Sequence, residues 1–247
     1  MKIGIIPARY ASTRFPGKPL ALINNKPMIQ HVYERAREAN LDDLYVATDD
    51  DRIKMAVENF GGKVILTGTH HVSGTDRCAE AAQILHLKEN DFIVNIQGDE
   101  PFIRKEEINL LINLIKNPKV QIATLVIPIL NEEELANPNK VKVVFTHSNQ
   151  ALYFSRAPIP YELRITNYEL RIINPLFHKH IGIYAYSKDI LQQITQLPAS
   201  SLEETEKLEQ LRWLQNNYTI HVEICHHESM AIDTPEDLYR CAGEVED

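Results

Sequence analysis

The sequence predicts an α/β fold built on a doubly wound, mostly parallel β-sheet. In the first half of the 247 residues, short β-branched runs alternate with segments of helical period. The runs are apolar nearly throughout, which is typical of strands in a sheet that is covered on both faces. Strand–helix alternation at this spacing favours right-handed crossovers and therefore parallel strands. The predicted strands are 3–6, 44–48, 63–66, 92–96 and 122–126, and the predicted helices between them are 27–39, 52–60, 75–87 and 105–116.

A change of pattern near residue 130 predicts a lobe inserted at about 130–185 into a single domain of residues 1–247. Two strand-like runs flank the turn-forming segment 147–150, which indicates a hairpin. Ser200 and Glu203 have the spacing of a capping box, so we expect a helix from there to about residue 216. The remaining expected elements are the hairpin strands 141–146 and 151–155, a strand at 180–186, a helix at 188–196, a strand at 221–225 and a helix that starts at Thr234.

Composition and charge limit the possible partners. The formal net charge is −8, which disfavours a broad surface for nucleic acid or an anionic membrane. No apolar run approaches the roughly 20 residues that span a bilayer. The three cysteines follow no metal-binding or disulfide spacing, and the N-terminus has no signal-peptide pattern. We therefore expect a cytoplasmic protein in which any phosphate site is a local cluster of basic residues.

The segment 5–20 is the strongest candidate for such a cluster. It directly follows the first predicted strand, and open α/β sheets bind ligands at the carboxyl ends of their strands. Arg9, Arg14 and Lys18 lie in a loop of small residues that prolines stiffen, so the loop can bring cations and backbone close to a triphosphate. The alternative is a solvated basic loop. The segment is neither G-x-G-x-x-G nor a Walker A sequence, which disfavours an NAD-dependent oxidoreductase and a P-loop NTPase.

Two aspartates are candidate magnesium ligands. Asp99 follows the predicted strand 92–96, so it lies at the same edge of the sheet as the basic loop. Asp233 immediately precedes a predicted helix. Magnesium prefers one or two carboxylates together with phosphate oxygens and water. The alternatives are a turn aspartate for Asp99 and a helix-terminal charge for Asp233, and the residues alone leave both open.

Nine motifs in order along nearly the whole chain resemble the CMP-Kdo synthetase family, the 3-deoxy-manno-octulosonate (Kdo) cytidylyltransferases. Any single motif is weak, whereas nine in the correct order are specific. They are IIPARYASTRFPGKPL at 5–20, VATD at 46–49, SGTDR at 73–77, VNIQGDEP at 94–101, NPNKVKVV at 137–144, ALYFSRA at 151–157, HIGIY at 180–184, LEQLR at 208–212 and DTPEDL at 233–238. The family pattern does not extend to the tandem heptad at 161–174, to which we assign no chemistry.

The resemblance implies a Rossmann-like nucleotidyltransferase sheet with a small dimerisation lobe, a homodimer, Mg²⁺ as cofactor, and CTP and Kdo as substrates. It implies Lys18, Asp99 and Asp233 as catalytic residues, with Asp99 and Asp233 as the metal ligands. The implied nucleotide-binding residues are Ala8, Arg9, Arg14, Lys18, Ser73, Thr75 and Arg77. The implied sugar-acid contacts are Gln97, Arg156, His180, Tyr184, Glu209 and Gln210.

Three other functions are alternatives to a Kdo cytidylyltransferase. A cytidylyltransferase for an 8-amino Kdo variant or for sialic acid would use the same mechanism on another acceptor. A catalytically silent nucleotide-binding protein of the same fold is disfavoured by the presence of the loop cations and both candidate metal carboxylates. An oxidoreductase is disfavoured by the absence of its glycine pattern.

Overall fold

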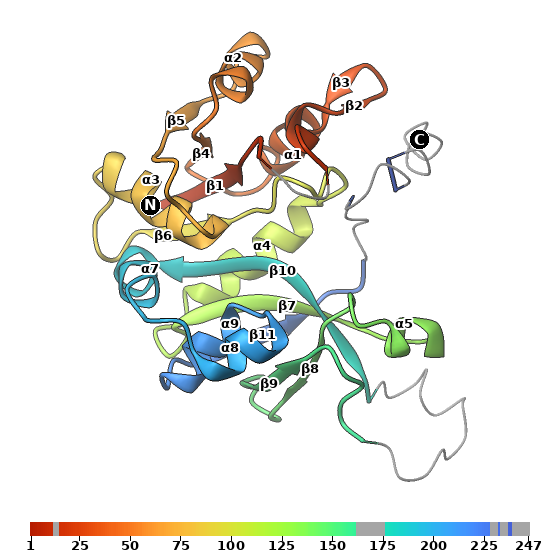
Figure 1. The fold of residues 1–247 in the computed structure, drawn as a ribbon. Helices are drawn as coiled ribbons and strands as arrows, with labels where there is room; N and C mark the ends of the chain where they lie inside the picture. The colour runs from red at the N-terminus through yellow and green to blue at the C-terminus, as the bar shows by residue number, and fades with distance from the viewer. Residues whose placement is uncertain (12–14, 162–175, 228–231, 233–236, 239–247) are drawn as a thin grey trace. The chain divides into compact units, whose positions relative to one another are not determined.

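The computed structural model describes residues 1–11, 15–161, 176–227, 232 and 237–238 (Figure 1). The chain divides into two compact units. The first consists of Met1–Ile112, Ala185–Thr195 and the described residues after Ser229. The second consists of Asn113–Tyr184 and the described residues of Gln196–Glu228. Most of the predicted lobe at about 130–185 therefore belongs to the second unit, while its part in dimerisation stays a prediction.

The first unit contains the parallel sheet that the apolar runs predict. Strand β1 (Lys2–Ala8) lies between β6 (Phe92–Asn95) and β4 (Asp43–Thr48), and β4 in turn pairs with β5 (Val64–Leu66). All three pairings are parallel. The inner residues of these strands are buried, as a sheet covered on both faces requires. The carboxyl ends of β1, β4 and β6 therefore converge on one edge.

Four helices predicted from periodicity are present, with shifted ends. They are α1 (Met28–Ala36), α2 (Asp51–Asn59), α3 (Gly74–Ile84) and α4 (Lys105–Ile115). Capping side chains set two of the starts: Asp50 accepts the amide of Arg52, and Ser73 forms a capping box with Asp76. Pro27 occupies the N-cap of α1, so the helix begins one residue later than predicted. The predicted helix at 188–196 is α7 (Lys188–Ile194).

Several short elements escaped prediction. A 3₁₀ turn, η1 (Lys18–Leu20), follows the basic loop, and a hairpin joins β2 (Leu22–Ile23) to β3 (Lys26–Pro27). The turn residues Asn24 and Asn25 both have positive φ, which asparagine tolerates better than most residues. Strands of two residues show no periodicity, so the sequence pattern does not indicate them. The second unit adds an unpredicted α5 (Glu132–Ala136), capped by Asn131.

The second unit combines parallel and antiparallel pairing. Strand β7 (Ile122–Pro128) pairs in parallel with β11 (Ile220–Ile224). The predicted hairpin is confirmed as β8 (Lys142–Phe145) and β9 (Ala151–Ser155). Strand β10 (His178–Ser187) is longer than predicted; its first residues, which belong to this unit, pair antiparallel with β8.

The prediction of one continuous helix from Ser200 to about residue 216 is wrong. The capping box of Ser200 and Glu203 is present, but α8 (Ser201–Glu206) ends after six residues, and α9 (Gln210–Gln215) is a separate helix. Lys207 adopts the left-handed conformation with φ 54°, and its amide bonds to the carbonyl of Glu203. A left-handed residue terminates a helix, and here no glycine marks it in the sequence.

Three predictions concern residues outside or at the limits of the described chain. The tandem heptad at 161–174 lies outside the described residues apart from Tyr161, and so does the start of the helix expected at Thr234. Cys78 and Cys225 are buried, while Cys241 lies outside the described residues. Among the helices described, none has the length and apolar character needed to cross a membrane.

Candidate active site

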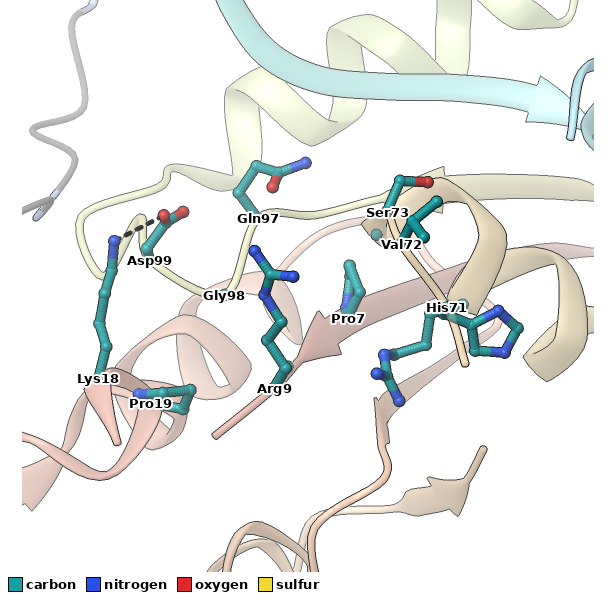
Figure 2. Close-up of a pocket in the computed structure, with 13 residues that line it drawn as sticks. Pro7, Arg9, Lys18, Pro19, His71, Val72, Ser73, Gln97, Gly98 and Asp99 are labelled. Carbon is teal, nitrogen blue, oxygen red and sulfur yellow. Dashed lines mark hydrogen bonds and ion pairs between the residues drawn. The ribbon is translucent and has the colours of Figure 1, made fainter. Parts of the chain in front are cut away.

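A polar pocket of about 230 Å³ lies in the first unit at the carboxyl ends of β1 and β6 (Figure 2). Three segments build it: the loop after β1, the loop before α3, and the turn after β6. Parallel strands explain the convergence, because their carboxyl ends meet at one edge of the sheet. The lining residues are Pro7, Ala8, Arg9, Lys18, Pro19, His71, Val72, Ser73, Gly74, Arg77, Gln97, Gly98 and Asp99.

The loop after β1 brings two cations to the pocket. Gly17 has φ 72°, a left-handed conformation that glycine adopts without strain, and its amide bonds to the carbonyl of Tyr10 at 2.9 Å. Lys18, the next residue, lines the pocket. Arg9 is exposed and points toward the segment Gln97–Asp99 (Figure 2). An anion in the pocket would therefore meet two basic side chains from one loop.

The turn after β6 supplies the acid. Asp99 Oδ2 lies 2.8 Å from Lys18 Nζ, and its side chain is 36% exposed. Gly98 permits this arrangement, because a Cβ at that position would lie 3.1 Å from the carbonyl oxygen of Pro7. The turn and the strand end are therefore packed backbone against backbone. The Asp99 carboxylate and the Lys18 ammonium both line the pocket.

The start of α3 forms the remaining wall. Ser73 lines the pocket and accepts the amide of Asp76 as the helix N-cap. Arg77 also lines the pocket, but its guanidinium pairs with Asp49 at 3.1 Å. Thr75 is buried and is absent from the pocket lining.

The structure thus gathers Ala8, Arg9, Lys18, Ser73, Arg77, Gln97 and Asp99 around one pocket. Arg14 and Asp233 lie outside the described residues, so their predicted roles stay predictions. The sequence reasoning missed His71 and Val72, which precede the recognised SGTDR motif. It also passed over the backbone role of Gly98, although a glycine after a buried strand was a usable signal.

The residues around Asp99 are compatible with a metal ion as far as they are described. Within the described chain, no group of three or more His, Cys, Asp or Glu side chains gathers as a metal cage. Magnesium does not need one, because phosphate oxygens and water complete its octahedron. Ile232 donates its amide to the carbonyl oxygen of Asp99 at 3.0 Å, which brings the residue before Asp233 in the sequence next to Asp99.

His180 lies in the second unit and is neutral. Burial lowers its pKa to about 3. Its Nε2 lies 3.0 Å from the hydroxyl of Thr124, which is itself 2.8 Å from the carbonyl of Ile183. Because the threonine hydroxyl has only one proton and the carbonyl accepts it, we assign the imidazole proton to Nε2. His180 is therefore a hydrogen-bonding group rather than a cation.

Tyr184 and the start of α9 lie close to His180. The rings of His180 and Tyr184 are 5.2 Å apart, and Tyr184 packs edge-on against Trp213 of α9 at 5.1 Å. The Tyr184 hydroxyl is buried and has no hydrogen-bond partner among the described residues. Burial, with a further contribution from the charge of Glu209, raises the pKa of Tyr184 well above its usual value. Gln210, the first residue of α9, is buried.

Arg156 is engaged with backbone in the second unit. Its guanidinium donates to the carbonyls of Glu206 at 2.7 Å, Pro138 at 3.0 Å and Lys207 at 3.3 Å. Its own amide donates to the Glu206 carboxylate at 2.9 Å. These bonds hold the end of β9 against the end of α8. Whether Arg156 also binds a sugar acid stays a prediction.

A parallel α/β sheet with a partly cationic pocket at its carboxyl edge defines the class of the protein as a nucleotide-binding α/β protein. Comparison with known proteins narrows the class. Residues 3–224 match the family described as cytidylyltransferase. The chain belongs to the CMP-Kdo synthetase (3-deoxy-manno-octulosonate cytidylyltransferase) family.

Relatives are similar over almost their full lengths. A 3-deoxy-manno-octulosonate cytidylyltransferase of Parabacteroides distasonis is 54% identical over 96% of this chain and 94% of its own. An 8-amino-3,8-dideoxy-manno-octulosonate cytidylyltransferase of Shewanella pealeana is 51% identical over 98% of this chain and 97% of its own. A solved structure of CMP:2-keto-3-deoxy-manno-octonic acid synthetase complexed with CTP superposes with a TM-score of 0.89. It is 42% identical and covers 98% of this chain and 97% of that one.

Proposed function

We propose that the protein transfers CMP from CTP to the anomeric hydroxyl of Kdo, releasing pyrophosphate and supplying an activated sugar for lipopolysaccharide biosynthesis. The observation that carries the proposal is the pocket in which Arg9, Lys18 and Asp99 converge at the carboxyl edge of the sheet. The family membership and the CTP complex of the 42% identical synthetase support CTP as the nucleotide.

The transfer depends more on stabilisation of negative charge than on a covalent bond between the substrate and the protein. The Kdo anomeric oxygen forms a bond to the α-phosphorus, the bond from that phosphorus to the pyrophosphate oxygen breaks, and the hydroxyl proton leaves. Negative charge grows on the departing pyrophosphate, so fixed cations lower the barrier. Arg9 and Lys18 are the cations of this pocket that the nucleotide would meet. Arg77 is less available, since Asp49 already holds its guanidinium.

Asp99 and Asp233 would hold Mg²⁺ in this proposal. A bound magnesium ion supplies positive charge to the phosphate oxygens and lowers the pKa of a coordinated hydroxyl. The hydrogen bond from Ile232 to the Asp99 carbonyl supports the pairing, because Asp233 is the next residue in the sequence. Lys18 pairs with Asp99 at 2.8 Å, and a triphosphate would offer this ammonium an alternative anionic partner.

The sugar acid would be bound by Gln97, Arg156, His180, Tyr184, Glu209 and Gln210. In the second unit, the unpaired hydroxyl of Tyr184 supports this assignment, because a buried donor without a partner is costly until a ligand oxygen accepts from it. The neutral imidazole of His180 suits hydroxyl groups rather than a carboxylate. A guanidinium such as Arg156 could hold the carboxylate of Kdo in a bidentate pair, if it exchanged some of its backbone partners.

A homodimer and a cytoplasmic location complete the proposal. Both follow from the family resemblance and from the composition rather than from any contact described above. Size-exclusion chromatography with light scattering tests the first, and cell fractionation tests the second.

The 8-amino variant of Kdo is the second candidate acceptor. Relatives at 51% identity act, by name, on 8-amino-3,8-dideoxy-manno-octulosonate, while others at 54% act on Kdo itself. Overall similarity therefore does not separate a hydroxyl from an amine at carbon 8. The two acceptors differ in charge near neutral pH, so a single polar residue near carbon 8 would suffice for discrimination.

A panel of acceptors tests the proposal. Pyrophosphate release is measured with CTP and Mg²⁺ alone, with Kdo, with its 8-amino variant, and with sialic acid. We expect release that depends on Kdo and exceeds the rate with sialic acid by at least about a hundredfold. A preference for the 8-amino variant would select the second candidate, and no acceptor-dependent release would refute the proposed function.

A further inference from the structure

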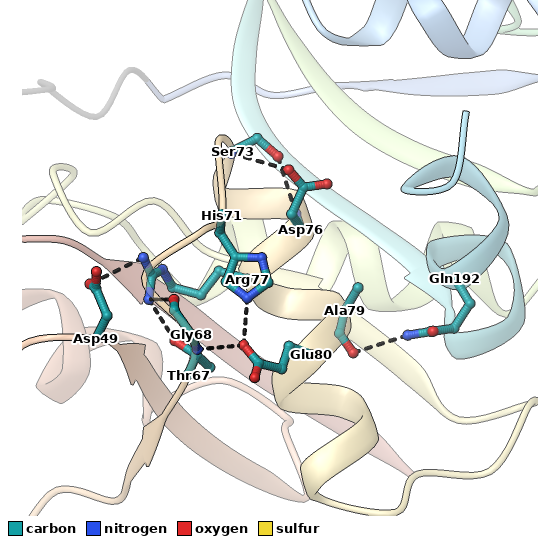
Figure 3. Close-up of polar contacts among 10 residues, drawn as sticks. All are labelled: Asp49, Thr67, Gly68, His71, Ser73, Asp76, Arg77, Ala79, Glu80 and Gln192. Atoms are coloured by element: carbon teal, nitrogen blue, oxygen red, sulfur yellow. Dashed lines mark hydrogen bonds and ion pairs between the residues drawn. The ribbon is translucent and has the colours of Figure 1, made fainter. Parts of the chain in front are cut away.

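The loop between β5 and α3 is held by a carboxylate that does not itself line the pocket. Glu80, one helical turn beyond the Arg77 of α3, accepts the amide of Gly68 at 2.7 Å through Oε2. The same oxygen pairs with Nε2 of His71. Figure 3 shows the His71 ring turned toward Glu80. One oxygen atom thus joins both ends of the segment 68–71.

This loop is part of the pocket wall. His71, Val72 and Ser73 are three consecutive lining residues. The His71 side chain is only 8% exposed, so its ring is packed behind the wall rather than standing in the pocket. The position of this wall therefore depends on what lies behind it.

A second anchor acts on the start of the same loop. Arg77 is buried, donates to the Thr67 hydroxyl at 2.5 Å and pairs with Asp49 at 3.1 Å. Gln192 of α7 holds the carbonyl of Ala79 at 3.0 Å, which ties α3 itself in place (Figure 3). Arg77 is in the pocket lining, whereas Glu80 is not. Glu80 is therefore the residue whose effect on a nucleotide can only be indirect.

The charge state of Glu80 suits this role. Burial alone would raise its pKa, but the bonds from His71 and from the Gly68 amide lower it below its usual value. The carboxylate is ionised near neutral pH and can only accept, so His71 donates through Nε2. Hydrogen bonds to a charged acceptor are stronger than neutral ones.

We infer that Glu80 is a positioning residue for the nucleotide: it fixes the segment 68–71 so that His71 and the following Val72 form one wall of the pocket. The inference rests on the proposed function in taking CTP as the ligand. The competing explanation is a purely structural role, in which Glu80 contributes to the stability of the first unit and nothing more.

Two substitutions separate these explanations. Glu80→Ala removes the acceptor of both bonds. Glu80→Gln retains an oxygen of the same reach, which can accept from Gly68 and from His71. Val57→Ala is the matched control, because Val57 is a fully buried residue of α2 outside the pocket lining, and its truncation lowers stability without touching the loop.

The test combines calorimetric titration of CTP, with Mg²⁺ and without Kdo, with thermal unfolding. We expect Glu80→Ala to weaken CTP binding about tenfold, Glu80→Gln to remain within about threefold of wild type, and Val57→Ala to unfold earlier with unchanged affinity. Kdo KM should stay within about twofold throughout. If Glu80→Ala does not fold, Glu80→Asp carries the same test, because the shorter side chain withdraws the carboxylate from Gly68 and His71 without changing a residue of the pocket lining.

Unchanged CTP affinity in Glu80→Ala, with a loss of stability like that of Val57→Ala, would overturn the inference. Failure of the proposed function has a different signature, namely wild-type protein that binds CTP but releases no pyrophosphate on addition of Kdo. The titration itself requires no turnover, so the two failures are distinguishable.

Discussion

The partly buried imidazole of His180 links the stability of the protein to pH. Its pKa is about 3 in the folded protein, against about 6.5 for an unperturbed histidine. Between these values the unfolded chain binds a proton that the folded chain excludes, so stability falls as pH falls from about 6.5 toward 3. The contribution of this one group amounts to about 2 kcal/mol between roughly pH 7 and pH 5.

Urea unfolding at the two pH values checks this effect. The single tryptophan, Trp213, is buried next to Tyr184 and reports on the same region by fluorescence. We expect His180→Gln to lose about 2 kcal/mol less than wild type on acidification. Equal losses in both proteins would mean that the pKa of His180 is not lowered in the folded protein.

Lys18 should act on CTP and not on the sugar acid. Its ammonium lines the pocket beside Asp99, and a triphosphate would take up this charge. We expect Lys18→Ala to raise the KM for CTP at least about tenfold and to change that for Kdo less than twofold. Lys26→Ala is the matched control, because Lys26 is an exposed lysine of the same region, paired with Glu34. A rise in Kdo KM alone would reverse the assignment of the loop.

Asp99 should be needed for turnover and not for folding. Its side chain is partly exposed and its neighbour is a lysine, so asparagine fits in its place. We expect Asp99→Asn to lose at least about a hundredfold in kcat, with a melting temperature within a few degrees of wild type. Manganese binding, measured by electron paramagnetic resonance in the presence of CTP, should weaken in parallel. A large drop in melting temperature with retained metal binding would identify Asp99 as a structural turn residue.

At the scale of single elements, two capping boxes offer a comparison between stability and function. Ser73 caps α3 and lines the pocket, whereas Ser200 caps α8 and lies in the second unit. Each serine-to-alanine change should cost about 1 kcal/mol of stability. We expect only Ser73→Ala to raise the KM for CTP as well. Equal effects of both changes on CTP would contradict the position of Ser73 in the nucleotide pocket.

Helices and strands with a hydrophobic period or a capping residue could be predicted from the sequence. A helix end that depends on the backbone conformation of a single residue could not. The strands of the first unit and its helices follow from apolar runs and spacing, as does the β8–β9 hairpin. The break between α8 and α9 was not predicted, because lysine is a good helix former and nothing in the sequence indicates that Lys207 adopts a left-handed conformation. The strands β2 and β3 are two residues each, which is too short for a hydrophobic alternation to appear in the sequence.

In the molecule as a whole, the part of the site that could be predicted is the part whose position follows from the order of the parallel strands. Parallel strands bring the loops after β1 and β6 to one edge, so Arg9, Lys18 and Asp99 were expected together. The anchoring of His71 by Glu80 was not, because it depends on how a loop folds back on its helix. The partners of Arg156 are carbonyls about 18 and 50 residues away, and backbone carbonyls carry no sequence signal.

Transfer of the CMP group of CTP to Kdo can be followed by isotopic labelling. Protein, Mg²⁺ and Kdo are incubated with CTP labelled at either the α- or the γ-phosphorus, and the products are separated. We predict that the α-label appears in a CMP-sugar of the mass of CMP-Kdo and the γ-label in pyrophosphate, only when Kdo is present. An α-label that remains in CTP, or that appears in free CMP at a rate independent of Kdo, would show that the protein does not transfer CMP to Kdo.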